Sequence, residues 1–278
     1  MHSLILCRYG ELTIKGANRI LFERCLTQNI RSLFARAGIS ATVTRKRGRT
    51  FVSVPQEAES SAITLLRRVF GLSSISPVHP TALDYTSIEQ VAKILLEGKN
   101  FQTFAVRAQR LQKIFAPTPE IHRNLGRFIE QTFDRKVDLE NPDIEFGIEI
   151  IDQAYLFTER LSCPGGLPYG IEGTVLAIVE SPEDLLAAWL VMKRGCAIIP
   201  VQRTNFSTAL LNDYGCTVQA IHIKHINEIG GLMERYHAVA VVAQEPISDV
   251  PVFRPLVGYS PAMLQQKVNA LCTPLLPK

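Results

Sequence analysis

The feature that most constrains the fold is the alternation of apolar strands and helices in the last third of the chain. Four apolar runs, at residues 174–179, 196–202, 217–225 and 238–244, alternate with helical stretches at 182–194, 207–215, 227–237 and 260–271. Runs that are apolar throughout are typical of strands buried on both faces, and helical crossovers make such strands parallel. Residues 173–278 are therefore predicted to form a Rossmann-like α/β domain.

A linker precedes this domain. Five glycine or proline residues lie between Pro164 and Gly170, and hydrophobic alternation stops there. We expect a domain boundary at this point, with a chain of 278 residues long enough for two or three domains.

The N-terminal half is predicted to be α+β. Residues 3–12 suggest a strand, 17–38 a helix, 40–54 a hairpin and 59–71 a second helix. Residues 72–81 suggest a Pro/Ser-rich connector, followed by a helix at 87–98, a strand at 100–110, a helix at 118–133 and two strands within 143–161. Helical spacing in the first helix predicts one buried face, made of Ile20, Leu21, Cys25, Leu26, Ile30 and Leu33.

Charge is unevenly distributed. Residues 1–50 hold ten Lys/Arg and two Asp/Glu, whereas residues 165–278 hold eight and nine. An anionic partner such as nucleic acid is therefore expected at the N-terminal part. No apolar run approaches the ~20 residues that span a bilayer, and no signal peptide is recognised, so we expect a cytoplasmic protein without membrane contact.

The six cysteines form no C-x-x-C pair, which argues against a zinc or iron–sulfur site. Buried free thiols are the simplest interpretation. His222 and His225 form the nearest approach to a metal pair, and we assign no metal.

Five segments in order resemble the 4-thiouridine tRNA sulfurtransferase (ThiI) family. They are RYGELTIKGANRILFERCLTQNI from Arg8, VRAQRLQKIFAPTPEIHRNLGRFI from Val106, VDLENPDIEFGIEI from Val137, GGLPYGIEGTVLAIV from Gly165 with MKRG at 192–195, and VPVFRPLVGYSPAMLQQKV from Val250. The resemblance implies an N-terminal ferredoxin-like domain (1–75), a THUMP domain (76–164) and a PP-loop domain (173–278). In that family the first two domains bind tRNA, with THUMP holding the acceptor end, and the third adenylates a uridine with ATP.

The chain departs from this family at the nucleotide loop. Where the family has S-G-G-x-D-S, the chain has Glu180, Ser181, Pro182, Glu183 and Asp184. Close approach of pyrophosphate needs glycine and free N–H donors at a helix start. Here Pro182 has no N–H, the carboxylates repel phosphate, and Ser181 as N-cap with Asp184 at the third helical position predicts a self-contained helix start.

Two other departures concern the family's later segments. The family's Gly-Gln-Val-Ala-Ser-Gln-Thr loop is replaced by residues 244–250, and its sulfur-accepting cysteine aligns beyond Cys272. We expect no catalytic residue and no cofactor. ATP with magnesium would be needed only if the nucleotide site is a rearranged, active one.

Candidate RNA-binding residues come from four basic segments. Lys15 and Asn18 are candidates through the resemblance alone. The hairpin residues Arg45–Arg49 contact RNA or form a solvated turn. Arg107, Arg110 and Lys113 match a basic pattern of the family. In the helix that follows, Thr118 is the expected N-cap. The expected buried stripe consists of Ile121, Leu125, Phe128 and Ile129. Arg123 and Arg127 either contact phosphates or pair with Glu120 and Glu130. The full set of candidates is Lys15, Asn18, Arg45, Lys46, Arg47, Arg49, Arg107, Arg110, Lys113, Arg123 and Arg127.

The sequence thus predicts a tRNA-binding protein related to the sulfurtransferases, without adenylation, that acts in or alongside tRNA modification. Its expected partners are the acceptor end of tRNA and either an active modifying enzyme or a second copy of the chain. An active sulfurtransferase with a rearranged ATP site is the alternative. A nucleotide-sensing regulator is a third possibility.

Overall fold

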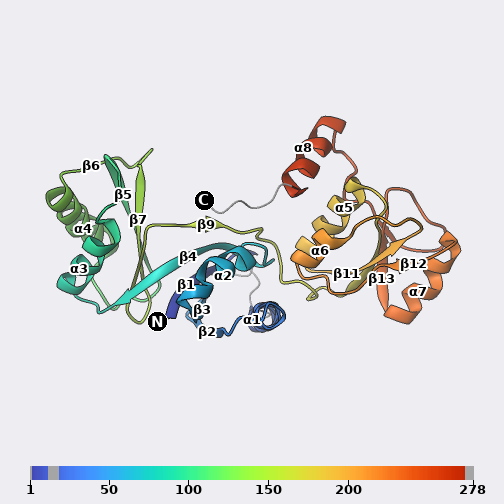
Figure 1. Cartoon of the computed structure of the whole chain (residues 1–278), viewed down its shortest axis with the longest axis horizontal. Coiled ribbons are helices and arrows are strands. Elements are labelled where there is room, and N and C mark those ends of the chain that lie inside the picture. The colour runs from blue at the N-terminus through green and yellow to red at the C-terminus, as the bar shows by residue number, and fades with distance from the viewer. Residues whose placement is uncertain (1, 12–18, 273–278) are drawn as a thin grey trace. The chain divides into compact units, whose positions relative to one another are not determined.

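The computed structural model describes residues 2–11 and 19–272 (Figure 1). Within these ranges the chain divides into two compact units. Unit 1 comprises Met1–Arg8, Ala41–Glu59 and Ser74–Ser162, and unit 2 comprises Tyr9–Ser40, Ser60–Ser73 and Cys163–Lys278. None of the described helices is long and apolar enough to cross a membrane. The candidate residues Lys15 and Asn18 lie outside the described residues.

Nine strands of the N-terminal half form one sheet in the order β2-β3-β1-β4-β8-β7-β5-β6, with β9 paired to β4. Their bounds are β1 His2–Tyr9, β2 Thr42–Lys46, β3 Arg49–Pro55, β4 Leu72–Thr81, β5 Thr103–Arg110, β6 Lys136–Val137, β7 Ile144–Ile150, β8 Ala154–Phe157 and β9 Leu161–Ser162. The helices of this half are α1 Arg19–Arg36, α2 Glu59–Leu66, α3 Tyr85–Leu96 and α4 Thr118–Phe133, with a 3₁₀ turn η3 at Gln56–Ala58.

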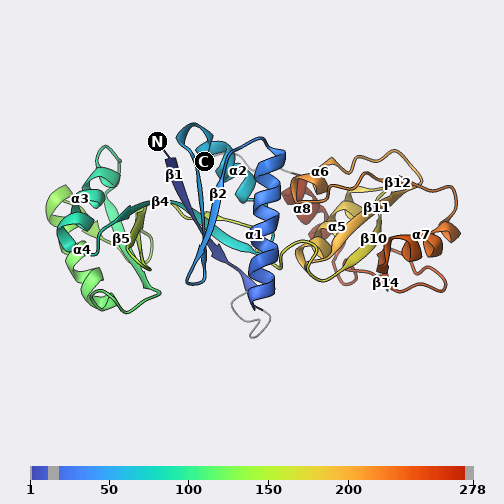
Figure 2. The same cartoon turned by 90° about the horizontal axis from the view of Figure 1, so that it is seen from below.

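The hairpin β2–β3 turns through only two residues. Lys46 pairs with Arg49 across the strands, and Arg47 and Gly48 between them have φ of 43° and 78°. Two consecutive positive φ values define a type I′ turn, whose twist matches that of the flanking strands. Figure 2 labels β1 and β2, the strands that flank β3 in the sheet order.

The part of unit 1 that holds α3 and α4 has both helices on one sheet face. β5 pairs in parallel with β7, which pairs antiparallel with β8. Alternate strand residues and the helices make one core, which includes Ile88, Leu96, Phe104, Phe146, Ile148 and Leu156. Ile121, Leu125 and Ile129 of α4 are buried as the sequence predicts, and Phe128 packs against them. The helix begins one residue early, however: Pro117 rather than Thr118 is the N-cap, and its carbonyl accepts from Glu120 and Ile121.

The opposite face of β7 and β8 packs on a second apolar cluster of unit 1, made of Leu6, Phe51, Val78, Ile151, Tyr155 and Phe157. Gly147 is required there, because a Cβ at this position would lie 2.1 Å from the Phe157 ring. The Arg8 guanidinium covers the same ring, 4.6 Å from its centroid. Absence of a side chain at residue 147 therefore lets Phe157 and Arg8 stack over the sheet.

Residues 72–81 are not the connector that their Pro/Ser content predicted, but the strand β4. Three of its residues pair antiparallel with β8, from His79 to Thr81. Its buried serines are satisfied by arginines: Arg160 Nε donates to Ser74 Oγ (3.1 Å) and Arg8 Nη1 to Ser76 Oγ (2.9 Å). A polar strand interior is stable when each buried hydroxyl has a partner.

The buried face of α1 also differs from the prediction. Ile20 and Leu21 are 60% and 58% exposed, whereas Phe22, Leu26, Thr27, Ile30 and Phe34 are buried. Steps of four residues carry the buried stripe from Phe22 through Leu26 and Ile30 to Phe34, because residues i and i+4 lie on one helix face. Ile20 and Leu21 fall beside that stripe.

The C-terminal part of unit 2 is the expected parallel α/β fold. Its five strands, in the order β12-β11-β10-β13-β14, are all paired in parallel (Figure 1). They are β10 Thr174–Ile178, β11 Ala197–Gln202, β12 Ile221–His222, β13 Ala238–Val242 and β14 Val252–Phe253; the helices are α5 Pro182–Lys193, α6 Ala209–Asp213, α7 Ile229–Tyr236 and α8 Pro261–Cys272, with η4 at Ile226–Glu228.

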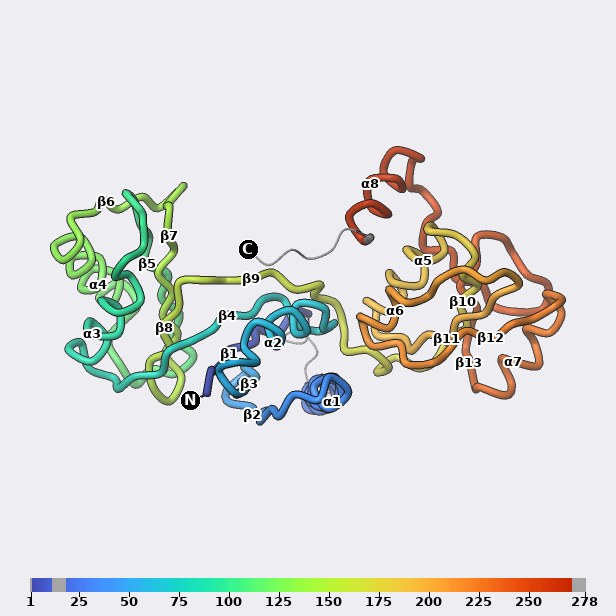
Figure 3. The backbone as a smooth tube through the Cα atoms, viewed as in Figure 1, coloured from blue at the N-terminus to red at the C-terminus, as the bar shows by residue number. Residues whose placement is uncertain are grey.

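Both faces of this parallel sheet are covered. One apolar cluster joins Val175, Ala177 and Ile198 to α5, α6 and α8, and the other joins Leu176, Ile199 and Val241 to Ile229 of α7. The tube in Figure 3 traces the chain from one strand through a helix to the next. The prediction of a doubly covered, Rossmann-like sheet is confirmed.

The linker at 163–173 packs closely on α5 and β11. A Cβ on Gly166 would lie 2.2 Å from the carbonyl oxygen of Lys193, while Leu167 N–H donates to that oxygen at 3.0 Å. Tyr169 Oη accepts from Ile198 N–H (3.1 Å), and burial raises the pKa of this phenol. Gly166 therefore allows a close approach between the linker and the end of α5.

Candidate nucleic-acid interface and nucleotide loop

The hairpin's basic residues separate into two kinds. Arg45 and Arg47 are exposed, whereas Arg49 is buried and Lys46 is half-buried. Strand alternation explains the division. Lys46 and Arg49 form one cross-strand pair, whereas Arg45 pairs with Thr50, and neighbouring residues of a strand point to opposite faces. Arg45 and Arg47 are thus the hairpin side chains that a phosphate can reach.

Arg49 belongs to a buried ion triad. Its Nε donates to Glu149 Oε2 at 2.8 Å, and Arg8 Nε donates to Glu149 Oε1 at 2.5 Å. The three residues are at most 9% exposed. Burial lowers the pKa of Arg8, and the Glu149 carboxylate opposes that shift. Each oxygen of one carboxylate therefore holds an arginine from a different strand, β1 or β3.

Lys46 is held by the turn between β7 and β8. Its Nζ donates to Asp152 Oδ2 (2.7 Å) and to Tyr155 Oη (3.2 Å). The hydrogen bond to Asp152 raises the pKa of Lys46. Burial raises the pKa of Asp152, but the hydrogen bonds from Lys46 and Tyr155 outweigh it, and the net pKa lies below its ordinary value. Lys46 is an anchor of the hairpin in this structure.

The β5 candidates point to different sides of the sheet. Arg107 is exposed, but its Nε donates to Glu145 Oε1 (2.8 Å) and its Nη2 to the Leu139 carbonyl (2.9 Å). Arg110 is partly buried at the end of β5, where it lies in register with Ile150, and Lys113 is exposed in the loop beyond. Gln109 Oε1 accepts from Arg49 Nη2 (3.0 Å). The hairpin and the carboxyl end of β5 are therefore in direct contact within unit 1.

Arg123 and Arg127 are exposed on α4. Neither forms an ion pair with Glu120 or Glu130 among the described residues, and Glu120 accepts from Tyr85 Oη instead (3.4 Å). In the same helix, His122 Nε2 accepts from Ala108 N–H at 3.0 Å. Burial, with a smaller effect of Arg107, lowers the pKa of His122. This bond places the start of α4 beside the end of β5.

The turn after β10 starts α5 as the sequence predicts. Ser181 is the N-cap and Pro182 the first helical residue, and Ser181 Oγ accepts from Asp184 N–H at 3.1 Å. Asp184 is buried; its Oδ2 accepts from Glu180 N–H and its Oδ1 from Gln244 Nε2, both at 3.1 Å. Two backbone donors at this helix start, the N–H groups of Glu180 and Asp184, are thus bound to the protein's own oxygens.

An ion pair joins Glu180 of the turn to Arg203, which follows β11. Glu180 Oε1 accepts from Arg203 N–H (2.7 Å) and Nε (3.0 Å), and Oε2 accepts from Arg203 Nη2 (2.6 Å). These hydrogen bonds lower the pKa of Glu180 and raise that of Arg203. Bidentate geometry makes this one of the stronger surface pairs.

The position of this turn matters, because β10 lies between β11 and β13, where the strand order reverses. In open α/β sheets ligands bind beyond the carboxyl ends of the strands at such a point. Here Asp184 and Gln244 bond across it, and Glu180 and Arg203 bond beside it. Side-chain hydrogen bonds therefore span the position at which this type of fold binds ligands.

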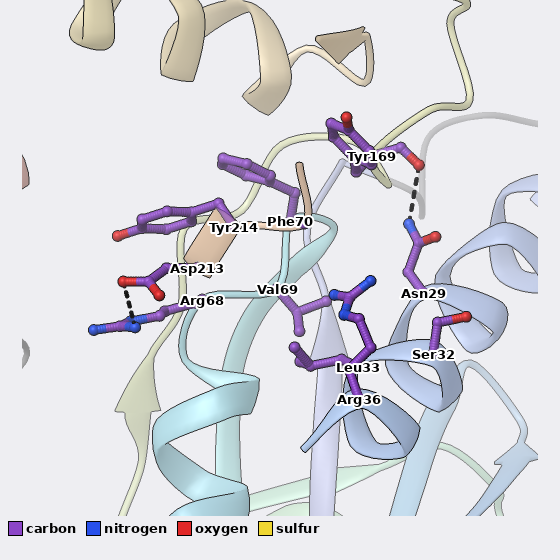
Figure 4. A pocket seen from close by; sticks show the side chains of 11 residues that line it. Asn29, Ser32, Leu33, Arg36, Arg68, Val69, Phe70, Tyr169, Asp213 and Tyr214 are labelled. Atoms are coloured by element: carbon purple, nitrogen blue, oxygen red, sulfur yellow. Dashed lines mark hydrogen bonds and ion pairs between the residues drawn. The ribbon is translucent and has the colours of Figure 1, made fainter. Parts of the chain in front are cut away.

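A small cavity of about 50 Å³ lies elsewhere in unit 2 (Figure 4). Asn29, Ser32 and Arg36 come from α1, and Asp213 and Tyr214 from the end of α6 and the turn after it. Arg68 Nη1 pairs with Asp213 Oδ2 (2.6 Å), and Asn29 Nδ2 donates to the Tyr169 carbonyl (3.0 Å). Pockets that hold drug-sized ligands start at about 300 Å³. This cavity is too small for a nucleotide.

Four residues of these networks were not among the site residues predicted from the sequence. Glu149 stands within an apolar strand, Asp152 in a short turn, and Gln244 and Arg203 directly after strands. An acid at a position that alternation assigns to a buried face is the one available hint, because a buried carboxylate requires a partner. The partners themselves lie 100 and 141 residues away from Glu149.

The fold and these sites define a class: a basic ferredoxin-like and THUMP module joined to a parallel α/β domain. Residues 4–76 match the ThiI ferredoxin-like domain and residues 83–159 the THUMP domain. The chain belongs to the tRNA sulfurtransferase family. A probable tRNA sulfurtransferase of Methanocaldococcus jannaschii is 32% identical over 255 residues, which cover 84% of this chain and 67% of that protein.

Other relatives agree. The probable tRNA sulfurtransferase of Moorella thermoacetica is 36% identical over 211 residues, 74% of this chain and 53% of that protein. The chain thus spans about half the length of that relative. Among solved structures, PH1313 from Pyrococcus horikoshii has a TM-score of 0.84 at 28% identity and covers 97% of this chain and 99% of that one. A 4-thiouridine synthetase in an RNA complex with bound ATP has a TM-score of 0.79 at 23% identity, covers 98% of this chain and 85% of that one, and shares the fold.

Proposed function

We propose that this chain binds tRNA through its ferredoxin-like and THUMP parts and acts in or alongside tRNA modification without adenylating its substrate. The observation that carries the proposal is a set of basic side chains at the surface of unit 1. Its exposed or partly buried basic side chains include Arg47, Arg110, Lys113, Arg123 and Arg127. Cations on rigid strands and helices suit a phosphate backbone, and the relatives are described as tRNA sulfurtransferases.

The absence of adenylation is proposed from the turn at residues 180–184. The N–H groups of Glu180 and Asp184 bond to the side chains of Asp184 and Ser181, and Pro182 has no N–H to offer. The acceptor end of tRNA is the expected ligand, and an active modifying enzyme or a second copy of the chain is the expected partner. The alternative, an active sulfurtransferase with a rearranged ATP site, is favoured by the names of the relatives and by the retained parallel sheet.

Binding of tRNA to the full chain is expected to weaken steeply with salt. Each phosphate contact releases counterions and contributes about 0.7–0.9 to the slope of log K against log salt. Alanine at Arg47, Lys113 or Arg123 should lower that slope by roughly one and weaken binding about equally for different tRNAs. Fluorescence anisotropy at several salt concentrations measures both quantities.

Arg235→Ala is the matched control, since Arg235 is an exposed arginine of the C-terminal part. Equal losses from this control and from the three variants would place the RNA surface elsewhere. Failure of the unaltered chain to bind tRNA at low salt would refute the proposed function.

ATP with magnesium is expected to give no binding heat, with or without tRNA. Phosphates at this turn would face Glu180, Glu183 and Asp184, and each close like-charge pair costs about 1 kcal/mol even in a water-like dielectric. Isothermal titration calorimetry measures the affinity, and a pyrophosphate assay measures adenylation. Micromolar affinity for ATP, or pyrophosphate release that depends on tRNA, would establish the alternative instead.

A further inference from the structure

The two residues that flank the hairpin turn are both fixed to other strands. Lys46 bonds to Asp152 in the β7–β8 turn, and Arg49 bonds to Glu149 on β7 and to Gln109 on β5. Only Arg47 and Gly48 lie between them. Because the residues on both sides of this two-residue turn are hydrogen-bonded, the turn cannot shift without breaking those bonds. The anchors therefore set the direction of Arg47.

The anchor at Asp152 is a small network of its own. Tyr155 Oη donates to Asp152 Oδ1 at 2.8 Å and accepts from Gln153 Nε2 at 3.2 Å. The Tyr155 ring lies 4.6 Å from that of Phe51, which belongs to β3. Asp152 is therefore held in place on one side by a buried tyrosine, while its side chain is 47% exposed.

The anchors also bring the hairpin turn beside the end of β5. Gln109, which Arg49 contacts, precedes Arg110, and Arg110 lies in register with Ile150 two residues before Asp152. The hairpin turn therefore lies next to the end of β5, and the loop that carries Lys113 follows directly after that strand. Arg47 is near these cations only because its hairpin is docked there.

We propose that Asp152 is a positioning residue for RNA binding: it strengthens the binding of an RNA phosphate backbone although its own charge repels one. It acts through Lys46, whose bond to Asp152 fixes the hairpin turn. Arg47 and the cations at the end of β5 can then contact the same RNA, and the hairpin does not have to be ordered when the RNA binds. This inference rests on the proposed tRNA binding. Preorganisation of this kind raises affinity by cutting the entropy lost on association.

The sign of the effect separates this role from simple electrostatics. Removal of an acidic group from the vicinity of a phosphate surface ordinarily strengthens binding, because the local potential becomes more positive. Release of the hairpin, in contrast, weakens RNA binding. For Asp152→Asn in the full chain we expect tRNA binding about three- to fivefold weaker, the range that an exposed ion pair can supply.

Three comparisons test the proposal by anisotropy with tRNA. Glu145→Gln removes an acid from another exposed pair on β7 and should leave binding equal or tighter. Asp152→Glu keeps the carboxylate and should restore part of the loss. In a background of Arg47→Ala, Asp152→Asn should cause no further loss, because the residue through which it acts is gone.

The salt slope should stay unchanged in Asp152→Asn, since no phosphate-contacting cation is removed, and amide hydrogen exchange at residues 45–49 should become faster. Tighter or unchanged binding by Asp152→Asn, or an equal loss in the Arg47→Ala background, would overturn the proposal. If the unaltered chain binds no tRNA, the proposed function fails. That result differs from tRNA binding that becomes tighter in Asp152→Asn, which overturns only the role of Asp152.

Discussion

Alanine in place of Glu149 is expected to lower the free energy of unfolding by about 3–5 kcal/mol. The substitution leaves two guanidinium groups, those of Arg8 and Arg49, in a site where the three residues are at most 9% exposed. Removal of one member of a buried ion network leaves uncompensated charge, and that is more costly than loss of the attraction alone. Chemical denaturation of the full chain, followed by circular dichroism, measures the change.

Glu145→Ala is the control on the same strand and the same face of β7. Its pair with Arg107 has the same chemistry and a similar Nε to Oε distance of 2.8 Å, but its side chains are 51% and 44% exposed. An exposed pair contributes about 0–1 kcal/mol. A loss of less than 1 kcal/mol for Glu149→Ala, or equal losses for the two variants, would show that burial does not raise the cost.

Alanine in place of Gly166 is expected to cost about 2–5 kcal/mol. Gly166 has φ of 74°, a region that costs about 1–2 kcal/mol for a residue with a Cβ. A Cβ there would also lie 2.2 Å from the backbone oxygen of Lys193, and overpacking adds about 1–3 kcal/mol. A backbone atom cannot rotate away, so the linker must separate from the end of α5.

Gly165 gives an adjacent control. It has nearly the same φ, 70°, and a Cβ there would meet nothing within 4 Å. Gly165→Ala should therefore carry the backbone cost alone, about 1–2 kcal/mol. Thermal unfolding of both variants measures the difference, and equal midpoints would rule out steric contact as the reason for glycine at residue 166.

Features with local causes could be predicted from the sequence. Apolar runs and intervening helices gave the doubly covered parallel sheet, and Ser181, Pro182 and Asp184 gave the helix start after β10. The stripe of Ile121, Leu125 and Ile129 in α4 was predicted from its spacing. Each shows as a pattern among residues that are close in the sequence, where side-chain direction follows from the backbone.

Features that depend on distant partners could not be predicted from the sequence. Prolines and serines made residues 72–81 resemble a connector, yet Arg8 and Arg160 satisfy the serines and make a strand possible. The position of the buried face of α1 depended on which apolar residues the rest of the chain covers, so Ile20 and Leu21 were misassigned. Lys46 and Arg49 looked equivalent to Arg47 in a basic run, and only Asp152 and Glu149 distinguish them. Their roles as RNA contacts, like those of the exposed cations, stay predictions.

The division of the chain between two units has a consequence for its synthesis. Every segment of unit 1 precedes residue 163, but unit 2 joins early residues to late ones: Arg68 to Asp213, Asn29 to Tyr169 and Gly71 to Gly165. At translation rates of about 5–20 residues per second, Asp213 is made about 7–29 s after Arg68. A ribosome-bound chain that has reached Ser162 already holds all of unit 1, whereas α1 and the turn before β4 must wait for partners that do not yet exist. Unit 1 can therefore fold while the protein is being made, whereas unit 2 closes only after its segments beyond residue 162 have been synthesised.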